Sequence, residues 1–262
     1  MNRTYSIVTF IFAFMVLAGF SVEPAHAASR LLVMENAYNA RDLGGYAASN
    51  GKTVRWGALY RAGDLHSLSD NDVDVLRDIG IKTVVDFRTD GESQAEPHRL
   101  PPTVVNIVAL PITPGNIPDL TTLTEKNAEE MMLQVYRALV TDARQQYREF
   151  FRILADPDNG PVLFNCSAGK DRTGLAAALV LLALGVDRET VYEDYLLSAE
   201  YVKGKYQRMV DENPDLRPVV TVRREYLHAA LDEIDAKYGG IGQYLREQLN
   251  VDTELLLKRY TE

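Results

Sequence analysis

The chain has 262 residues, a formal net charge of −9 and a hydrophobic content of 46%. This apolar content is ample for a buried core, and it excludes an intrinsically disordered or fibrous protein. The acidic balance argues against general nucleic-acid binding, so a substrate with several negative charges would need a local basic pocket.

Residues 1–27 have the pattern of a secretory signal peptide. A basic residue precedes an apolar run over 7–20, and the small residues of Ala-His-Ala close the segment at Ala27. The apolar run is short for a membrane span, so an uncleaved anchor is the weaker alternative. We expect cleavage after Ala27, no stable membrane insertion afterwards, and an exported protein that is periplasmic or secreted. Residues 28–262 contain no repeat or linker and are expected to form a single domain.

The first recognisable unit of secondary structure lies within residues 69–88. Ser69 and Asp72 match a capping box, apolar residues follow at helical spacing, and Gly80 suits the position just past a helix end. The run IKTVVDFR at 81–88 then has the composition of a buried β-strand. A helix followed by a glycine and a strand is typical of an α/β protein.

Two further strands and several helices are predicted downstream. Strands are expected within 104–110 and 160–165, and a helix that is apolar nearly all round is expected from about Thr173. Residues 127–155 have an apolar spacing that predicts one or two amphipathic helices. The remainder, from Arg188, is expected to form further helices. The predicted fold class is therefore α/β.

The only cysteine of the chain, Cys166, lies in the stretch NCSAGKDRTG at 165–174. It follows a predicted strand and precedes a predicted helix, so backbone N–H groups of the loop and the helix dipole would stabilise an anion there. These donors and Arg172 favour a nucleophilic thiolate, and Arg172 offers a planar fork for two phosphoryl oxygens. The alternative is a cysteine that serves as a small buried hydrophobe. The small and charged residues around Cys166 favour a catalytic cysteine over one that only packs in the core.

The stretch CSAGKDRTG resembles the loop of the exported bacterial protein tyrosine phosphatase family, which includes enzymes that act on phosphoproteins and on phosphoinositides. Four further stretches share the resemblance: NARDLGGY at 39–46, LYRAGDL at 59–65, VVDFRTDGESQAEP at 84–97 and YGGIGQYLREQLNVD at 238–252. The resemblance implies a cysteine-phosphatase-like fold with a central, mainly parallel sheet flanked by helices. A lid formed by residues 127–155 and the preceding loop is expected by analogy.

The activity that the resemblance implies is hydrolysis of a phosphate monoester through a phosphocysteine intermediate on Cys166, with Arg172 as the phosphate clamp. No metal or cofactor is implied, and the substrate is a phosphorylated protein or a phosphoinositide. The proton donor is Asp171, inside the loop, or Asp86, at a strand end where it could instead brace Arg88. The remaining phosphate-binding positions are Ser167, Ala168, Gly169, Lys170, Thr173 and Gly174.

Several of these positions also have a structural interpretation. Lys170 would meet additional phosphates in a phosphoinositide phosphatase, or it is an exposed lysine. Thr173 would help the sulfur leave, or it is a helix N-cap. Arg41 and Asp42 contribute to the substrate pocket, or they form a pair that braces the fold. The many tyrosines, including those within 127–155, are expected to serve packing rather than recognition.

Asn165 departs from the resemblance, because the residue before the nucleophile is usually a histidine in these phosphatases. Asparagine donates hydrogen bonds but carries no positive charge, so the thiolate would be less stabilised. Two rival functions follow. One is a non-catalytic phosphate- or phosphoinositide-binding protein whose catalysis has decayed. The other is a rhodanese-like sulfurtransferase, which the conjunction of Arg172 and Thr173 disfavours.

Overall fold

The computed structural model describes residues 30–115 and 119–262. The predicted signal peptide at 1–27 lies outside these residues. Within the described ranges, no helix combines the length and the apolar character needed to cross a membrane.

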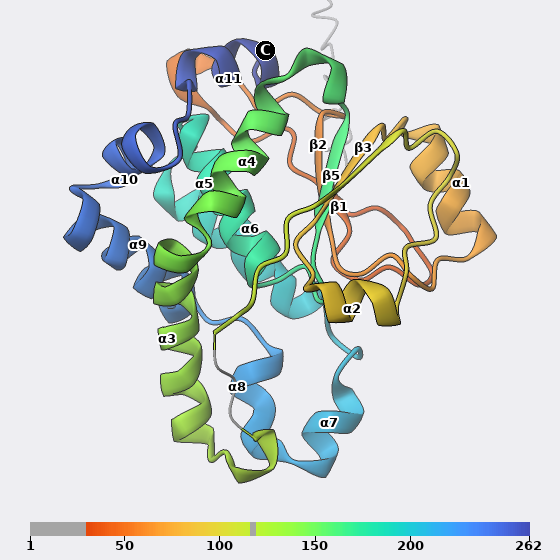
Figure 1. Ribbon diagram of the computed structural model, residues 1–262, viewed down its shortest axis with the longest axis vertical. Helices are drawn as coiled ribbons and strands as arrows, with labels where there is room; N and C mark the ends of the chain where they lie inside the picture. The colour runs from red at the N-terminus through yellow and green to blue at the C-terminus, as the bar shows by residue number, and fades with distance from the viewer. Residues whose placement is uncertain (1–29, 116–118) are drawn as a thin grey trace, which may run out of the picture.

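A five-stranded sheet forms the centre of the protein (Figure 1). The strand order is β1-β2-β5-β3-β4, in which β2, β5, β3 and β4 run parallel and β1 runs antiparallel to β2. The strands are β1 (Arg41–Asp42), β2 (Leu59–Ala62), β3 (Thr83–Asp86), β4 (Asn106–Ala109) and β5 (Val162–Asn165). The predicted α/β fold with a mainly parallel central sheet is therefore confirmed.

Helices flank this sheet on both faces (Figure 1). In chain order they are α1 (Asp70–Asp78), α2 (Asp90–Ala95), α3 (Glu125–Asp142), α4 (Arg144–Ala155), α5 (Arg172–Ala183), α6 (Arg188–Tyr201), α7 (Gln207–Glu212), α8 (Arg217–Val220), α9 (Arg224–Tyr238), α10 (Ile241–Gln243) and α11 (Thr253–Tyr260). Alternation along the strands divides the core in two. Val84 and Leu163 pack on the α1 side, whereas Val85 and Phe164 pack on the side of α4 and α5.

The local predictions hold with small shifts of boundary. Ser69 and Asp72 form the expected capping box at the start of α1, and Gly80 adopts φ +71° just past its end. The strand predicted over 81–88 is shorter, as β3. The region 127–155 forms two helices, α3 and α4, because Ala143 between them leaves helical geometry with ψ +13°. Helix α5 is central as predicted, with every residue except Leu182 buried.

The lower ends of α3, α7 and α8 extend beyond the sheet (Figure 1). They share a small hydrophobic cluster of Leu123, Ala128 and Leu216, which is separate from the two cores that cover the sheet. This arrangement places helical walls opposite the loop that joins β5 to α5.

Candidate active site

The candidate site is the loop at 166–171, which joins β5 to the N-terminus of α5. Ligands bind at the carboxyl ends of parallel strands, and this loop lies at that edge of the sheet. Gly169 has φ +66°, and a Cβ there would lie only 2.4 Å from the carbonyl oxygen of Ala62, so the turn requires glycine. Asn39 Nδ2 and an Arg61 guanidinium nitrogen donate to the Gly169 carbonyl at 2.8 and 2.7 Å. The loop is therefore held firmly against β2.

The backbone N–H groups of the loop are free to bind an anion. Among the described residues, no N–H of residues 167–171 donates to a protein acceptor. The first turn of α5 follows directly, and its dipole adds partial positive charge at the same spot. The loop is thus a preformed cradle for a phosphoryl group.

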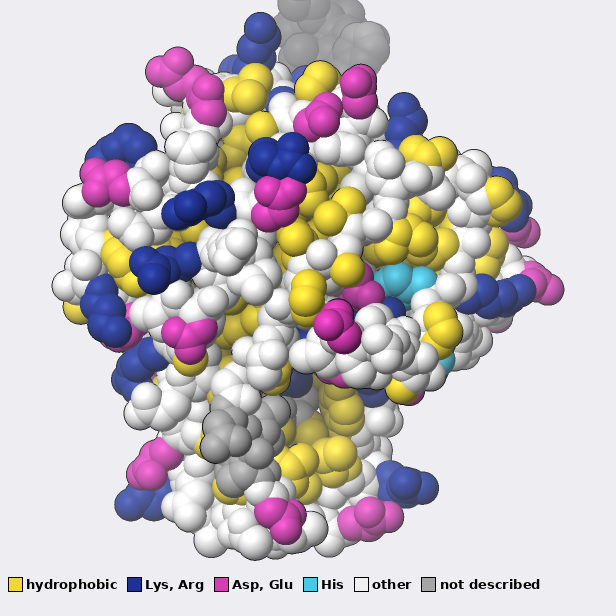
Figure 2. Space-filling model, in the orientation of Figure 1, with side chains coloured by type: hydrophobic (Ala, Val, Ile, Leu, Met, Phe, Trp, Pro, Cys, Tyr) yellow, Lys and Arg dark blue, Asp and Glu magenta, His cyan; other side chains and the backbone are white. Residues whose placement is uncertain are grey.

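A cavity of about 210 Å³ opens over this cradle. Cys166, which is 2% exposed, and Arg172 both line it. The rest of its wall is mainly apolar, and Figure 2 shows a hollow below α2 in which hydrophobic side chains gather. These wall residues are Pro114, Leu120, Met131, Met132, Val135, Met209, Val219 and Val220, with Tyr206 beside them.

Arg172 is held by a carboxylate that the sequence interpretation missed. The two terminal nitrogens of its guanidinium donate to Glu92 at 2.7 and 2.8 Å, and Glu92 also accepts from the Ser167 hydroxyl. Burial acts to raise the pKa of Glu92, but the hydrogen bonds and charge of Arg172 outweigh it and bring the pKa to about 2. Glu92 is also the third residue of a capping box with Thr89 at the start of α2, and that pattern could have been recognised in the sequence.

Asp171 faces the cavity and is fixed on both sides. The Tyr136 hydroxyl donates to its Oδ1 at 2.8 Å, and Lys170 Nζ lies 3.0 Å from its Oδ2. Tyr136 was expected only to pack, so this contact corrects the prediction for one tyrosine. The N-terminal residues of α5 also differ from expectation, since the helix begins at Arg172 and Thr173 is not its N-cap.

Lys170 is buried rather than exposed. Its ammonium donates to the carbonyl oxygens of Val219 at 2.6 Å and Thr221 at 3.2 Å, besides its ion pair with Asp171. The alternative of a solvated surface lysine is therefore wrong. The lysine ties the loop to the end of α8, which forms the opposite wall of the cavity.

Asp86 lies outside the cavity lining. It accepts hydrogen bonds from the backbone and guanidinium of Arg88 at 2.9 to 3.1 Å, and His98 Nε2 lies 3.0 Å from its Oδ2. Burial acts to raise the pKa of Asp86, but His98 and then Arg88 outweigh it and hold the pKa below its usual value. The carboxylate is thus engaged in bracing Arg88, as its structural interpretation proposed.

Arg41 and Asp42 also brace the fold and do not line the cavity. Arg41 is fully buried and pairs with Asp194 of α6 at 3.0 Å, where Arg61 joins it at 2.8 Å. Asp42 accepts from the backbone N–H groups of Gly44 and Gly57. We expected an ion pair between Arg41 and Asp42. Within the described residues, Arg41 pairs with Asp194 instead.

Two buried polar side chains beside the loop lack hydrogen-bond partners among the described residues. They are Asn165, through both atoms of its amide, and Thr173, through its hydroxyl. Asn165 lies in register with Asp86 on β3 and Ala62 on β2. A histidine at this position would therefore come beside the carboxylate of Asp86.

One group of metal-ligating side chains, Asp64, His66 and Glu96, has donor atoms within 4.8 Å of one another in the described ranges. Lys205 Nζ lies 2.5 Å from Asp64 Oδ2, and His66 Nδ1 lies 2.5 Å from Asp64 Oδ1. The ammonium already neutralises the carboxylate, so this group is an ion-pair cluster.

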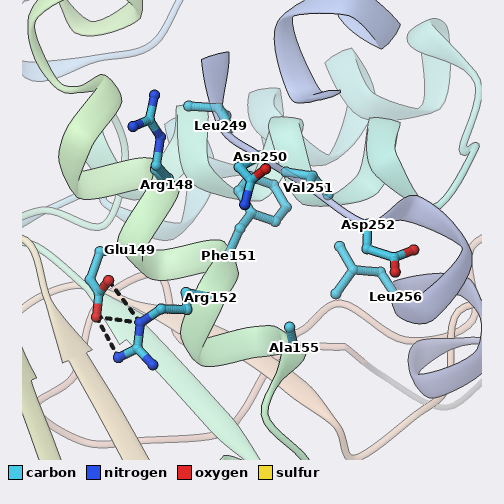
Figure 3. A pocket seen from close by; sticks show the side chains of 10 residues that line it. All are labelled: Arg148, Glu149, Phe151, Arg152, Ala155, Leu249, Asn250, Val251, Asp252 and Leu256. Atoms are coloured by element: carbon cyan, nitrogen blue, oxygen red, sulfur yellow. Dashed lines mark hydrogen bonds and ion pairs between the residues drawn. The ribbon is translucent and has the colours of Figure 1, made fainter. Parts of the chain in front are cut away.

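A second hollow, of about 260 Å³, lies between α4 and the segment before α11 (Figure 3). Its floor is apolar, with Phe151 and Leu256, and at its rim Arg152 is paired with Glu149. No residue of the Cys166 loop lines it. The hollow therefore has no part in the chemistry of the loop.

Sequences similar to this chain include proteins named as phosphatases. Residues 32–261 match the model of a family described as the tyrosine phosphatase family. A candidate tyrosine-protein phosphatase of Cupriavidus necator is 35% identical over 242 residues, which cover 87% of this chain and 88% of the relative. The triple specificity protein phosphatase PtpB of Mycobacterium tuberculosis is 31% identical over 258 residues, covering 82% and 92%. Among solved structures, the core catalytic domain of the PP-IP phosphatase SIW14 from S. cerevisiae aligns with a TM-score of 0.33 and 15% identity, over 66% of this chain and 94% of that one.

Proposed function

The chain belongs to the tyrosine phosphatase family, and on that premise we propose that it hydrolyses phosphotyrosine in proteins through a phosphocysteine intermediate on Cys166. The observation that carries this proposal is the joint position of Cys166 and Arg172 in one cavity, beside backbone N–H groups that have no acceptor within residues 30–115 and 119–262. A family match to phosphatases does not favour the sulfurtransferase or the non-catalytic binding protein.

In the first step, the Cys166 thiolate attacks phosphorus and the bond from phosphorus to the tyrosyl oxygen breaks. Asp171 gives a proton to that leaving oxygen, while Arg172 and the loop amides stabilise the charge that spreads over the phosphoryl oxygens. Asp171 suits this role better than Asp86 because it lines the cavity. Glu92 keeps the guanidinium of Arg172 oriented toward the cradle.

In the second step, water attacks phosphorus and the bond from sulfur to phosphorus breaks. The Asp171 carboxylate accepts a proton from the water, which releases inorganic phosphate and restores the thiolate. The Thr173 hydroxyl is buried beside the loop without a partner among the described residues, so it is available to donate to the departing sulfur.

The lining of the cavity favours an aromatic monophosphate over a substrate with several phosphates. The walls contributed by α3, α7 and α8 are apolar and suit a phenyl ring. In the described part of the chain, the cations that line the cavity are Lys170 and Arg172. Both already hold partners, so neither is a spare charge for a second phosphate.

A phosphate-release panel tests the proposal. It compares phosphotyrosine, phosphoserine and phosphothreonine peptides with phosphoinositides and inositol polyphosphates, since one relative is named a triple specificity phosphatase. We expect phosphotyrosine peptides to give the highest kcat/KM and Cys166→Ser to lower it by at least about a thousandfold. Preference for a phosphoinositide would overturn the substrate assignment. Full activity in Cys166→Ser would overturn the mechanism.

We also propose export, with cleavage after Ala27, from the sequence pattern of residues 1–27. N-terminal sequencing of the protein recovered from outside the cytoplasm would start at Ala28. An intact N-terminus on a membrane-bound protein would instead support the uncleaved anchor.

A further inference from the structure

Two tyrosine hydroxyls form a short chain that ends on Asp171. The Tyr136 hydroxyl, on α3, lies 2.8 Å from Asp171 Oδ1 and 2.6 Å from the hydroxyl of Tyr195, on α6. Tyr136 is 0% and Tyr195 1% exposed. Gly174 permits this arrangement, because a Cβ at that position would lie 3.3 Å from the Tyr195 ring.

The two hydrogen bonds that link Tyr195, Tyr136 and Asp171 both donate toward Asp171. Burial raises the pKa of Tyr136 and of Tyr195 well above the usual value, so both hydroxyls keep their protons. Tyr136 has a single proton and gives it to the Asp171 carboxylate, which can only accept when ionised. Tyr195 must therefore donate to the Tyr136 oxygen, which strengthens the bond that Tyr136 makes to Asp171.

Titratable groups from several elements lie near Asp171. They are Lys170 in the loop, Arg172 on α5, Tyr136 on α3, Tyr147 on α4, Tyr195 on α6, Tyr206 before α7, Tyr226 on α9, and the thiol of Cys166. Two of them, Lys170 and Arg172, are cations. The tyrosine that donates to the carboxylate directly is Tyr136.

We propose that Tyr136 is a positioning residue that fixes the direction of the Asp171 carboxylate. This role rests on the proposed function, in which Asp171 transfers the proton. Lys170 Nζ contacts both carboxylate oxygens, at 3.0 Å from Oδ2 and 3.3 Å from Oδ1. The Tyr136 hydroxyl adds a shorter contact to Oδ1, at 2.8 Å, from a fully buried side chain, so it restricts rotation of the carboxylate about its stem. The buried side chain of Tyr136 thereby sets the geometry of proton transfer from Asp171.

The substitution Tyr136→Phe tests this role, since it keeps the ring and removes only the hydroxyl. The basic limb of kcat/KM against pH reports the loss of the proton from the acid. The substitution takes one hydrogen-bond donor away from the carboxylate, so we expect that limb to move to higher pH.

The leaving group separates a positioning effect from a general loss of activity. Phenolate needs a proton to leave, whereas p-nitrophenolate needs it much less. We expect kcat/KM of Tyr136→Phe to fall about five- to tenfold with phenyl phosphate and less than about twofold with p-nitrophenyl phosphate. Tyr244→Phe is the matched control, because it removes a buried hydroxyl that donates to Val140 instead.

A double-substitution cycle with Asp171→Asn completes the test. If Tyr136 acts through Asp171, adding Tyr136→Phe to Asp171→Asn causes no further loss. An unmoved limb, equal losses with both esters, or an additive loss would overturn the positioning role. These outcomes are distinct from failure of the proposed function, in which the wild type would release no phosphate or Asp86→Asn would abolish the limb instead. Thermal unfolding of each variant checks that it is folded.

Discussion

Glu92 combines two tasks in a single carboxylate. It closes the capping box of α2, and it holds the guanidinium of Arg172 in a two-point ion pair beside the Ser167 hydroxyl. Its pKa of about 2 means that it is ionised throughout the physiological range. The phosphate clamp is therefore oriented before any substrate arrives.

We expect Glu92→Gln to lower kcat/KM about ten- to a hundredfold, because a neutral amide holds the guanidinium less firmly. Glutamine is compatible with a capping box, so the thermal midpoint should change little. Asp90→Asn is the matched control, since it changes an exposed charge on the same helix turn. A loss of activity that only follows a loss of stability would contradict the orienting role.

Asn165 offers a second test at the level of one side chain. Asn165→His would place an imidazole beside the Asp86 carboxylate, and that negative charge favours the cationic form of the imidazole. The positive charge would then lie next to the nucleophile, Cys166. Alkylation of Cys166 by iodoacetamide should then reach its half-maximal rate at a lower pH than in the wild type. Labelling is unambiguous because the chain has one cysteine. An identical rate profile for both proteins would refute this expectation.

Helix α6 is joined to the sheet by buried charge. Asp194 on α6 faces Arg41 of β1 and Arg61 of β2, and Arg61 in turn donates to the Gly169 carbonyl of the loop. Burial acts to raise the pKa of Asp194, but the two arginines outweigh it and bring the pKa to about 2. One carboxylate on a helix thus connects two strands to the cradle.

We expect Asp194→Asn to destabilise the protein by about 3–5 kcal/mol, because it leaves two buried guanidinium groups without their counter-charge. Asp235→Asn, which removes an exposed ion pair with Arg188, should cost less than about 1 kcal/mol. Urea unfolding of both variants measures the difference. Similar midpoints for the two would contradict the assignment.

The ion pairs of Asp194 with Arg41 and Arg61 predict how the stability of the protein depends on pH. The pKa of Asp194 is lowered from its ordinary value of 3.8 to about 2, so the unfolded chain binds the proton more readily than the folded protein. The stability that the pair supplies is fully present above pH 4 and is lost as the pH falls toward 2. The wild type should show this acid slope in urea unfolding, and Asp194→Asn should show a shallower one.

Local patterns in the sequence were sufficient to predict α1, α5 and the loop between β5 and α5. The capping box at Ser69, the apolar character of α5 and the stretch around Cys166 depend on neighbouring residues, so they can be recognised without knowledge of the fold. The side chains that contact the loop could not be predicted in this way. Glu92 lies 80 positions before Arg172, and Tyr136 lies 35 positions before Asp171. Only the parallel sheet and the packing of α3 bring them together, and no local pattern encodes that packing.

Across the whole molecule, the walls of the cavity are less well anchored than its floor. The Gly169 carbonyl of the loop is held by Asn39 and by Arg61 of β2. Helices α7 and α8 pack on the small cluster of Leu123, Ala128 and Leu216, and Lys170 joins the end of α8 to the loop. Segments with few buried apolar contacts open at low free energy. The lid was expected from 127–155 and the preceding loop. Of that region, Pro114 and Leu120 of the loop and the first half of α3 line one wall of the cavity, and α7 and α8 supply the other.

We expect amide hydrogens of residues 207–220 to exchange faster than those of α5 in the free protein. A bound oxyanion such as vanadate should slow that exchange, because it occupies the cavity that these walls enclose. Arg172→Ala, which loses the clamp, should show no slowing at the same vanadate concentration. Equal protection of α5 and residues 207–220 in the free wild type would contradict a mobile wall.

The depth of the cysteine has a consequence for oxidative damage. Cys166 is 2% exposed and lines the cavity of about 210 Å³, so a small oxidant such as hydrogen peroxide reaches the sulfur through that cavity. The sequence contains no second cysteine that could trap a sulfenic acid as an internal disulfide. Once oxidised, this sulfur depends on a small external thiol or on condensation with a backbone nitrogen to escape further, irreversible oxidation.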